Sequence, residues 1–405
     1  AECKQLFSPV EIVFNNESIS AENKNESISA DKRNAHTQLT FTVKNKFDFS
    51  ALDKVCVEWF LMHNGNAVDK GLLSLPPVKP GEETCITIDS TVLTTINTLD
   101  GLVYVHFNVL LAEDLSWAKK GFVIGQAEHL VQEKPLAVSS CADKDAVQKF
   151  VDAIEPCLFR IPTENDGLKN FFGEYGKEES VFYWKNKAVN SWLEMDLENI
   201  RRVKKDSTSW DLLCGPNAVS VFKDKKIGTF SLSLKTDGIG VRACIRLTIE
   251  PCANNLPRIG IAVKVPSSFT HISWIGSGPQ ESYSDRNTGA FLGSYRHAVK
   301  DLYVSYIVPQ ENGNRTGVRK LLLEGEKKLS IVSEKPIEFS AQIHDTRSTM
   351  KALHTFELEE TISKGYWILH LDCIQRGVGT ATCGPDTLEQ YCIKPGTYTM
   401  ELIIS

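Results

Sequence analysis

Short runs that alternate apolar and polar residues dominate the 405-residue chain. Residues 37–43 (TQLTFTV) and 53–61 (DKVCVEWFL) alternate with a period near two, which is typical of half-buried antiparallel strands. Dipeptides that tolerate positive φ, such as Asn64-Gly65 and Asp237-Gly238, separate these runs, and residues 223–226 (KDKK) form an expected charged hairpin tip. We therefore expect an all-β chain with little helix.

One segment favours a helix. Within residues 143–154, apolar side chains recur at helical spacing, and Pro156 follows as a stop. A stretch rich in Pro, Ser, Ala and Asp precedes this helix and indicates a domain boundary. We expect a β-sandwich over residues 1–135, a helical linker over residues 136–156, and a larger β domain over residues 157–405.

Composition narrows the classes of partner. Apolar residues make up 42% of the chain and charged residues 24%, with a net charge of -6 and a pI near 5.9. No run approaches the roughly 18 apolar residues of a membrane helix. An acidic chain offers no field that would attract phosphate backbones or anionic lipid, so we expect neither nucleic acid nor membrane as a partner.

The cysteines favour a reducing compartment. There are eleven, an odd number without CxxC spacing, so neither a zinc site nor a disulfide scaffold is indicated and some thiols should be free. We expect a cytoplasmic location. Three Asn-x-Ser/Thr sequons, at Asn16, Asn25 and Asn314, leave secretion as the alternative. The chain begins Ala-Glu-Cys-Lys without an initiator Met, so we expect a longer precursor or a processing boundary.

Four motifs carry a family resemblance. They are residues 159–167 (FRIPTENDG), 274–289 (WIGSGPQESYSDRNTG), 306–316 (YIVPQENGNRT) and 377–385 (GVGTATCGP). Residues 3–12 and 44–50 agree more loosely. In this order the motifs resemble the C-terminal, β-rich half of a bacterial-type β-galactosidase of glycoside hydrolase family 2. The resemblance starts where that family's catalytic barrel would have just ended.

The resemblance implies a fold and an incomplete active site. It implies an immunoglobulin-like β-sandwich followed by a large antiparallel β-supersandwich of the galactose-mutarotase type. The family holds its two catalytic glutamates on a (β/α)₈ barrel, and nothing here alternates strand and helix in that way. The tripeptide Asn16-Glu17-Ser18 echoes the family's acid/base motif, but it recurs within a polar duplication at residues 25–27, so we reject it.

The resemblance also assigns roles to residues. It places Asn165, Asp166 and Gly167 on a mobile loop at the rim of the sugar site. It places Thr382 and Cys383 on a platform where many members carry Trp, so Cys383 removes that aromatic face. We expect Asp285-Arg286 to form an internal charged clamp within a structural motif. That motif comprises Trp274, Gly278, Glu281, Tyr283, Asp285, Arg286, Glu311, Asn312 and Arg315.

These features lead to a principal hypothesis and two alternatives. The chain would be the non-barrel portion or small subunit of a β-galactosidase, inactive alone, whose partner is a barrel-bearing large chain or missing N-terminal domains. A galactoside would be its ligand. The family's magnesium and sodium belong to the barrel, so we expect no cofactor and no metal in this chain. The alternatives are an inactive relative that serves as a structural or interaction module in a larger assembly, and a stand-alone carbohydrate-binding module.

Overall fold

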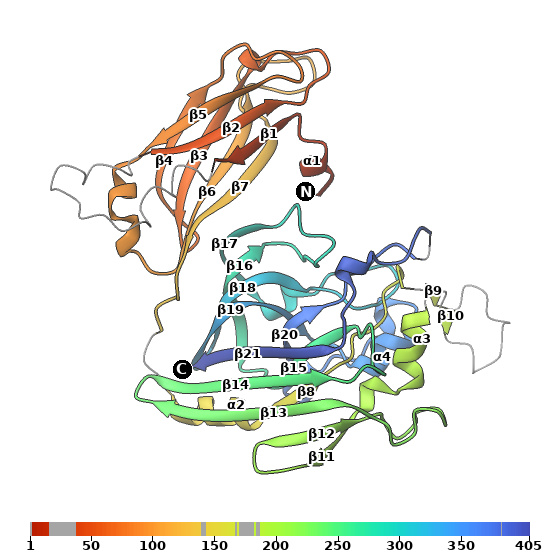
Figure 1. Ribbon diagram of the computed structural model, residues 1–405. Helices are drawn as coiled ribbons and strands as arrows, with labels where there is room; N and C mark the ends of the chain where they lie inside the picture. The colour runs from red at the N-terminus through yellow and green to blue at the C-terminus, as the bar shows by residue number, and fades with distance from the viewer. Residues whose placement is uncertain are drawn as a thin grey trace. The chain divides into compact units, whose positions relative to one another are not determined.

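The computed structural model describes residues 2–15, 38–138, 143–166, 168–169, 182–183, 187–381 and 383–405 (Figure 1). Two compact units result: Ala1–Ala137 with Phe291–Gly293, and Val138–Ala290 with Ser294–Ser405. We call these the first and second units. The duplicated polar segment, with Asn16, Glu17 and Asn25, lies outside the described residues.

The first unit is a β-sandwich of the immunoglobulin-like kind expected. One sheet has the order β1-β2-β5 and the other the order β4-β3-β6-β7. Phe41 of β2 and Phe107 of β6 meet edge to face, with ring centroids 4.8 Å apart, and join the two sheets in the core. The elements are α1 Glu2–Leu6, β1 Val10–Phe14, β2 Gln38–Asn45, η4 Leu52–Lys54, β3 Val55–His63, β4 Asn66–Ser74, β5 Glu83–Asp89, η5 Thr91–Thr98, β6 Leu102–Leu111 and β7 Val123–Glu133.

The predicted strands are confirmed as β2 and β3, where buried and less buried residues alternate along the chain. The turn between β3 and β4 uses Asn64 and Gly65 with φ of 49° and 88°, as a two-residue hairpin requires. The predicted helix is confirmed as α2 (Lys144–Asp152), whose first turn is capped by the carboxylate of Asp143.

The second unit is built around a 12-stranded antiparallel sheet that curls on itself. β19 joins its parts, since it pairs with β18 in both halves, with β21 in its first half and with β20 in its second half. The strands are β8 Ile154–Cys157, β11 Arg201–Lys204, β12 Ser209–Leu213, β13 Lys226–Asp237, β14 Gly240–Ile249, β15 Arg258–Pro266, β16 Phe269–Gly278, β17 Phe291–Ala298, β18 Arg315–Gly325, β19 Lys328–Gln342, β20 Tyr366–Gln375 and β21 Gly396–Ile404.

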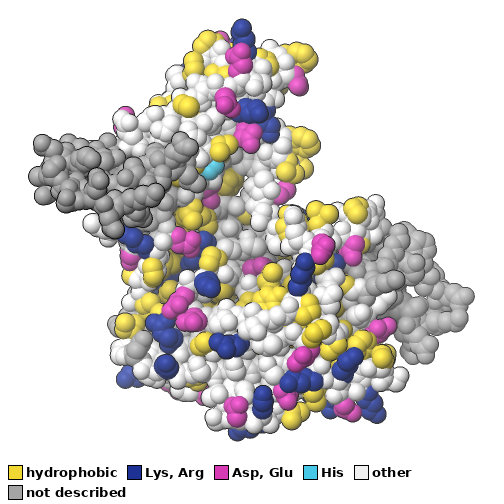
Figure 2. Space-filling model, in the orientation of Figure 1, with side chains coloured by type: hydrophobic (Ala, Val, Ile, Leu, Met, Phe, Trp, Pro, Cys, Tyr) yellow, Lys and Arg dark blue, Asp and Glu magenta, His cyan; other side chains and the backbone are white. Residues whose placement is uncertain are grey.

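A two-stranded sheet and short helices complete the second unit. They are β9 Leu168–Lys169, β10 Phe182–Tyr183, α3 Lys187–Glu194, η6 Leu197–Asn199, η7 Val299–Leu302, α4 Thr346–Lys351, η8 Thr355–Glu357, η9 Ile362–Lys364 and η10 Glu389–Tyr391. The buried side chains of α2 join the apolar core of this unit. On the face seen in Figure 2, Lys and Arg are interspersed with Asp and Glu over the second unit.

One local expectation is wrong. Residues 223–226 are not a hairpin tip, because β12 ends at Leu213 and β13 starts at Lys226 after a longer connection that is closed by the Cys214 N–H bond to the Lys225 carbonyl. The alternating residues Val219 and Val221 lie exposed in turns there. The helix ends at Asp152, before Pro156, and the chain enters β8 at Ile154.

Candidate functional site

A row of polar side chains lies in the interior of the second unit, on one face of β15, β19 and β20. In β20, Trp367, Leu369 and Leu371 face the apolar core and alternate with residues of the opposite face. The registers of β20 with β15 and β19 bring such residues side by side. We call this row the polar face; it consists of Arg258, Glu338, Ser340, Gln342, His370 and Asp372. Each is at most 8% exposed, so their polar groups depend on partners within the protein.

Arg258 provides the positive charge of the polar face. Its Nη2 lies 2.9 Å from Oε1 of Glu311, and its Nε lies 3.0 Å from Oδ2 of Asp372. Burial alone would lower the pKa of this guanidinium, but the carboxylates of Asp372 and Glu311 raise it, so Arg258 stays charged. Gly260 on the same strand leaves room for Asp372, because a Cβ there would stand 2.1 Å from Oδ1 of Asp372.

The polar face holds more carboxyl groups than Arg258 can neutralise. Burial raises the pKa of Glu338 to about 7 and that of Asp372 to about 7, and the charge of Glu338 adds to the effect on Asp372. Glu338 accepts hydrogen bonds from Asn314 Nδ2 at 2.6 Å and from the Gln375 N–H at 3.2 Å. Near pH 7 the pair therefore carries a proton that an exposed pair would have released.

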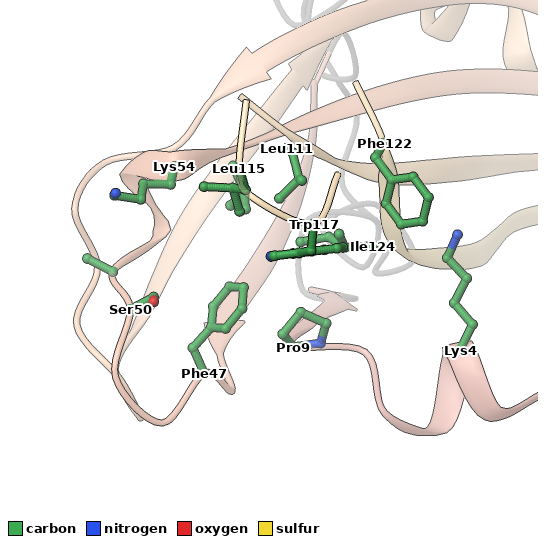
Figure 3. Close-up of a pocket in the computed structure, with 12 residues that line it drawn as sticks. Lys4, Pro9, Phe47, Ser50, Lys54, Leu111, Leu115, Trp117, Phe122 and Ile124 are labelled. Carbon is green, nitrogen blue, oxygen red and sulfur yellow. The ribbon is translucent and has the colours of Figure 1, made fainter. Parts of the chain in front are cut away.

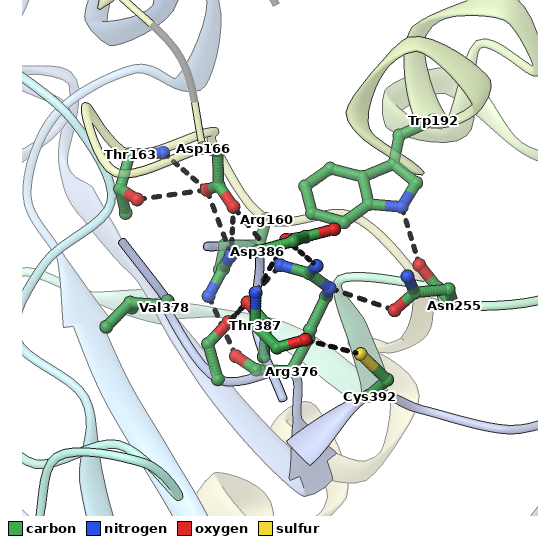
Figure 4. A network of polar contacts seen from close by, with 12 residues as sticks. Arg160, Thr163, Asp166, Trp192, Asn255, Arg376, Val378, Asp386, Thr387 and Cys392 are labelled. Carbon is green, nitrogen blue, oxygen red and sulfur yellow. Dashed lines mark hydrogen bonds and ion pairs between the residues drawn. The ribbon is translucent and has the colours of Figure 1, made fainter. Parts of the chain in front are cut away.

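A second buried network surrounds Asp166 (Figure 4). Its carboxylate lies 3.0 Å from Nη2 of Arg160 and 3.4 Å from Nη1 of Arg376, and it accepts bonds from the N–H and hydroxyl of Thr163 at 2.8 and 3.0 Å. Both guanidinium groups lie 5.7 Å from the ring centre of Trp192. All three charged side chains are fully buried, so this network fixes the turn at residues 163–166 to the start of the segment 376–387.

Asp285 connects two further segments. Its carboxylate accepts hydrogen bonds from the N–H groups of Val378 at 3.0 Å and Gly379 at 2.8 Å. Gly377 packs directly against it, since a Cβ at that position would lie 2.6 Å from Oδ2 of Asp285. Arg286, the other residue of this charged dipeptide, pairs with Glu281 at 2.6 Å, so Asp285 and Arg286 tie different segments.

Glu281 connects the segment 281–286 to the segment 306–313. Besides Arg286, it accepts bonds from the Tyr306 hydroxyl and, through Oε2, from the Gly313 N–H at 2.8 Å. The turn at residues 163–166 is also joined to the segment 306–313, since the Glu164 N–H donates to Gln310 Oε1 at 2.7 Å. Four segments, 163–166, 281–286, 306–313 and 376–387, are thus tied to one another in a closed circle, which we call the loop ring.

The first unit has a separate, mainly apolar pocket of about 460 Å³. Trp117, which is 63% exposed, lies across it, and Lys4 and Lys54 stand at its opposite sides (Figure 3). Lys54 is paired with Glu113 at 3.0 Å, while the ammonium of Lys4 lies 5.1 Å from the ring centre of Phe122. The pocket is lined by Lys4, Pro9, Phe47, Ser50, Ala51, Lys54, Val55, Leu111, Leu115, Trp117, Phe122 and Ile124.

Comparison with known proteins decides the family. A family model described as "Beta galactosidase small chain" matches residues 136–404. The chain belongs to the β-galactosidase small-chain family. A second model, "Beta-galactosidase, domain 4", matches residues 41–132. The resemblance inferred from the four motifs is thereby confirmed.

Relatives of this small-chain family member are longer proteins named β-galactosidase. The β-galactosidase of Arthrobacter sp. (strain B7) is 26% identical over 421 residues, which cover 92% of this chain and 40% of the relative. That of Kluyveromyces lactis is 27% identical over 402 residues, covering 91% and 36%. That of Streptococcus thermophilus is 36% identical over 136 residues, covering 33% and 13%. The chain therefore spans less than half the length of these curated relatives.

The rim residues inferred from the family resemblance differ in their surroundings. Asn165 is partly exposed and Cys383 is exposed, whereas Asp166 is buried and cannot offer its carboxylate to solvent. Cys383 sits in a turn that closes on itself, with its N–H bonded to the Thr380 carbonyl at 3.0 Å. Gly167 and Thr382 lie outside the described residues.

The structural motif residues of the small-chain family member lie in and beside the loop ring. Trp274 is buried, with its indole N–H bonded to the Ser277 carbonyl at 3.0 Å and the Arg315 guanidinium 5.7 Å from its ring centre. Gly278 packs against Tyr295, where a Cβ would lie 2.9 Å from the ring. Tyr283 is 1% exposed, and Asn312 accepts a bond from the Val304 N–H at 3.0 Å.

Sequence reasoning missed the charged residues inside the second unit. Arg160, Arg258, Glu338, Asp372 and Arg376 were not singled out, although they connect the motifs that were. The sequence pattern gave little indication that these residues are buried, because in β19 and β20 polar residues alternate with apolar ones as they would in a half-exposed strand. Among the described residues, no group of three His, Cys, Asp or Glu could hold a metal ion, and no helix is long and apolar enough to cross a membrane.

Proposed function

We propose that this chain is the non-barrel portion or small subunit of a β-galactosidase that hydrolyses terminal β-D-galactosides. In this proposal the chain supplies rim loops to the active site and contacts for assembly, and it is inactive without the barrel that carries the acid/base and the nucleophile. The observation that carries the proposal is the loop ring, in which motifs from four distant parts of the chain are tied together by side chains of the family pattern.

The proposal divides the loop ring into two kinds of residue. Asp166, Glu281 and Asp285 serve as internal ties, because their carboxylates are occupied by arginines and backbone N–H groups. Of the rim residues that the structure describes, Asn165 and Cys383 are the side chains left to meet a galactoside or the barrel. A small thiol at Cys383 gives a weaker platform than an aromatic ring, because a ring adds stacking contact with the apolar face of a sugar.

Purification from the native source is the first test. We expect the chain to occur in an assembly, or in a longer polypeptide, that hydrolyses nitrophenyl galactoside, while the isolated 405-residue chain shows no turnover. In the active assembly, Cys383→Trp should lower KM and Asn165→Ala should lower kcat/KM about tenfold or more. Lys225→Glu, at an exposed position outside the loop ring, is the matched control and should change neither.

Two outcomes would contradict this proposal. Turnover by the isolated chain would show that the missing barrel is not needed. A native assembly without galactosidase activity would instead favour the alternative, an inactive relative that acts as an interaction module.

One observation favours that alternative role for the first unit. Its apolar pocket is bordered by exposed aromatic residues, Trp117 at 63% and Phe122 at 49%, and exposed apolar patches of this kind mark contact surfaces. We expect Trp117→Glu to weaken assembly at least tenfold if this surface binds a partner. Leu72→Glu, at an exposed position on β4, is the control.

A further inference from the structure

A second pocket, of about 200 Å³, opens beside the polar face of the second unit. Its floor is formed by His370 and Ile368 of β20, with Ala262 of β15 and Gln342 of β19 paired to them in register. His344 and Glu198 also line it. Apolar side chains, among them Leu158, Ile161 and Ile200, make up much of the rest of the lining, together with Arg258 and Glu311.

His370 is the unusual group in this pocket. It lies on a central strand and is 8% exposed, yet its Nδ1 has no hydrogen-bond partner within the described protein. Nδ1 of His344 is also without a partner. Both nitrogens are closed to solvent, and leaving a buried polar atom unsatisfied costs about 1–3 kcal/mol, so two imidazoles that line this pocket have hydrogen-bonding capacity that the described protein does not use.

The charges around the pocket exclude ionic ligands. Burial lowers the pKa of His370 well below its usual value, with a further contribution from Arg258, and burial lowers that of His344. Both imidazoles are therefore neutral at pH 7. Arg258 is already paired with Glu311 and Asp372, and Glu198 lies 3.3 Å from the Arg347 guanidinium. An anion would thus find no free cation among the described lining residues.

The pocket suits a ligand with hydroxyl groups. A neutral imidazole nitrogen is a donor or an acceptor depending on the tautomer, and a hydroxyl can pair with either. Gln342 and Glu198 add further polar groups at the floor and the side. The walls are apolar, mainly Leu158, Ile161 and Ile200, and they match the C–H faces of a sugar. The volume corresponds to about seven waters of liquid, which is of the order of one monosaccharide.

We propose that the second unit holds a binding site for a small neutral polyol of up to monosaccharide size, with His370 as its central hydrogen-bonding group and His344 at its edge. The site lies entirely within this chain. It therefore requires neither a barrel nor catalytic activity, and it stands or falls separately from the proposed role in a β-galactosidase.

Histidine-selective isotope labelling provides the test, because the chain has only nine histidines. In NMR spectra of the isolated chain, D-galactose, D-glucose or glycerol should shift the imidazole signals of His370 and His344 in a saturable way. The signal of His354, which is exposed and lies outside the pocket, should not move. Lactose is tested as well. If lactose binds as tightly as galactose, the natural ligand is the end of a longer glycan. If galactose binds and lactose does not, the natural ligand is a free monosaccharide.

Variants make the assignment specific. His370→Gln, which removes the imidazole, and Ile368→Trp, which fills the pocket, should each weaken polyol binding about tenfold or more. His354→Gln is the matched control and should bind as the wild type does. Thermal unfolding checks that each variant folds. If His370→Gln does not fold, polyol binding by Ile368→Trp, a substitution at a partly exposed neighbouring position, still tests the proposal.

Two results would overturn the proposal. If none of the polyols shifts His370 or His344, the pocket holds water alone. If inorganic phosphate shifts these signals and polyols do not, the pocket is an anion site and the argument from paired charges is wrong.

Discussion

Asp166 and Arg376 are 210 residues apart in the sequence, and Oδ1 of the aspartate lies 3.4 Å from Nη1 of the arginine in the fully buried network of the second unit. Arg160 contacts both partners, donating to the Asp166 carboxylate and to the Arg376 carbonyl. A buried network of this kind joins parts of the chain that no local interaction would bring together. Its removal should therefore affect the whole unit.

Asp166→Asn should destabilise the second unit by about 3–5 kcal/mol. The substitution leaves two buried guanidinium groups without their shared carboxylate, and breaking one partner of a buried ion pair is costly. Urea unfolding, followed by the fluorescence of Trp192 and other buried indoles, measures the effect. Asp224→Asn, which removes the exposed pair with Arg201, should cost less than about 1 kcal/mol. Equal losses in the two variants would contradict a structural role for Asp166.

Asp285→Ala should loosen the segment that carries Cys383 without unfolding the unit. The carboxylate holds the N–H groups of Val378 and Gly379, so both amides should exchange hydrogen about tenfold faster or more. Hydrogen exchange with mass spectrometry on peptides from residues 376–387 is the measurement. Asp301→Ala, at an exposed position, is the control. Unchanged protection in Asp285→Ala would show that the segment is held by other contacts.

The contribution of Glu338 to the free energy of unfolding should fall as pH rises from about 4.5 to about 7. Burial raises the pKa of Glu338 from 4.5 to about 7, so over this range the folded state keeps a proton that the unfolded chain has lost. The stabilising contribution is complete below the unfolded pKa and disappears as pH passes the folded one. The difference between these two pKa values corresponds to at most about 3–4 kcal/mol.

Glu338→Gln should remove this contribution, so the wild type should lose stability relative to the variant as pH rises from 5 to 8, as measured by urea unfolding at several pH values. Glu389→Gln is a suitable control, because the hydrogen bond to Lys394 lowers the pKa of Glu389 and takes its titration out of the range. If Glu338→Gln retains the wild-type slope, another group is responsible for it.

Cysteine reactivity should follow burial. All ten described cysteines are free thiols, which confirms the expectation, drawn from the odd number of cysteines, that some thiols are free. Burial raises the pKa of Cys214 to about 11 and that of Cys373 to about 12, so at pH 8 Cys214 has roughly 100-fold less thiolate than an ordinary cysteine. Iodoacetamide should modify the exposed Cys85 and Cys383 in the native state, and Cys214 and Cys373 only after denaturation. Mass spectrometry of tryptic peptides would reveal the opposite order if burial does not control reactivity.

The sequence by itself determined the elements whose partners are local or whose pattern is unambiguous. The alternation in residues 53–61 led to β3, Asn64-Gly65 to the hairpin after it, and the helical spacing of residues 143–154 to α2. In each case, the period of apolar residues and the φ preference of one or two turn residues decide the conformation. The family motifs likewise needed only their order along the chain.

Only the tertiary structure decided what the motifs contact and which strand faces are covered. The pattern of residues 338–342 of β19 (EFSAQ) predicts a strand with one solvent-exposed face, yet that face is buried by segments distant in the sequence. Arg258 likewise pairs with carboxylates from two other parts of the chain. Asp285 likewise binds Val378 and Gly379 rather than its neighbour Arg286. Periodicity reports that a side chain points to one side of a strand, but the burial and charge partners on that side depend on contacts made only when the whole sheet has closed.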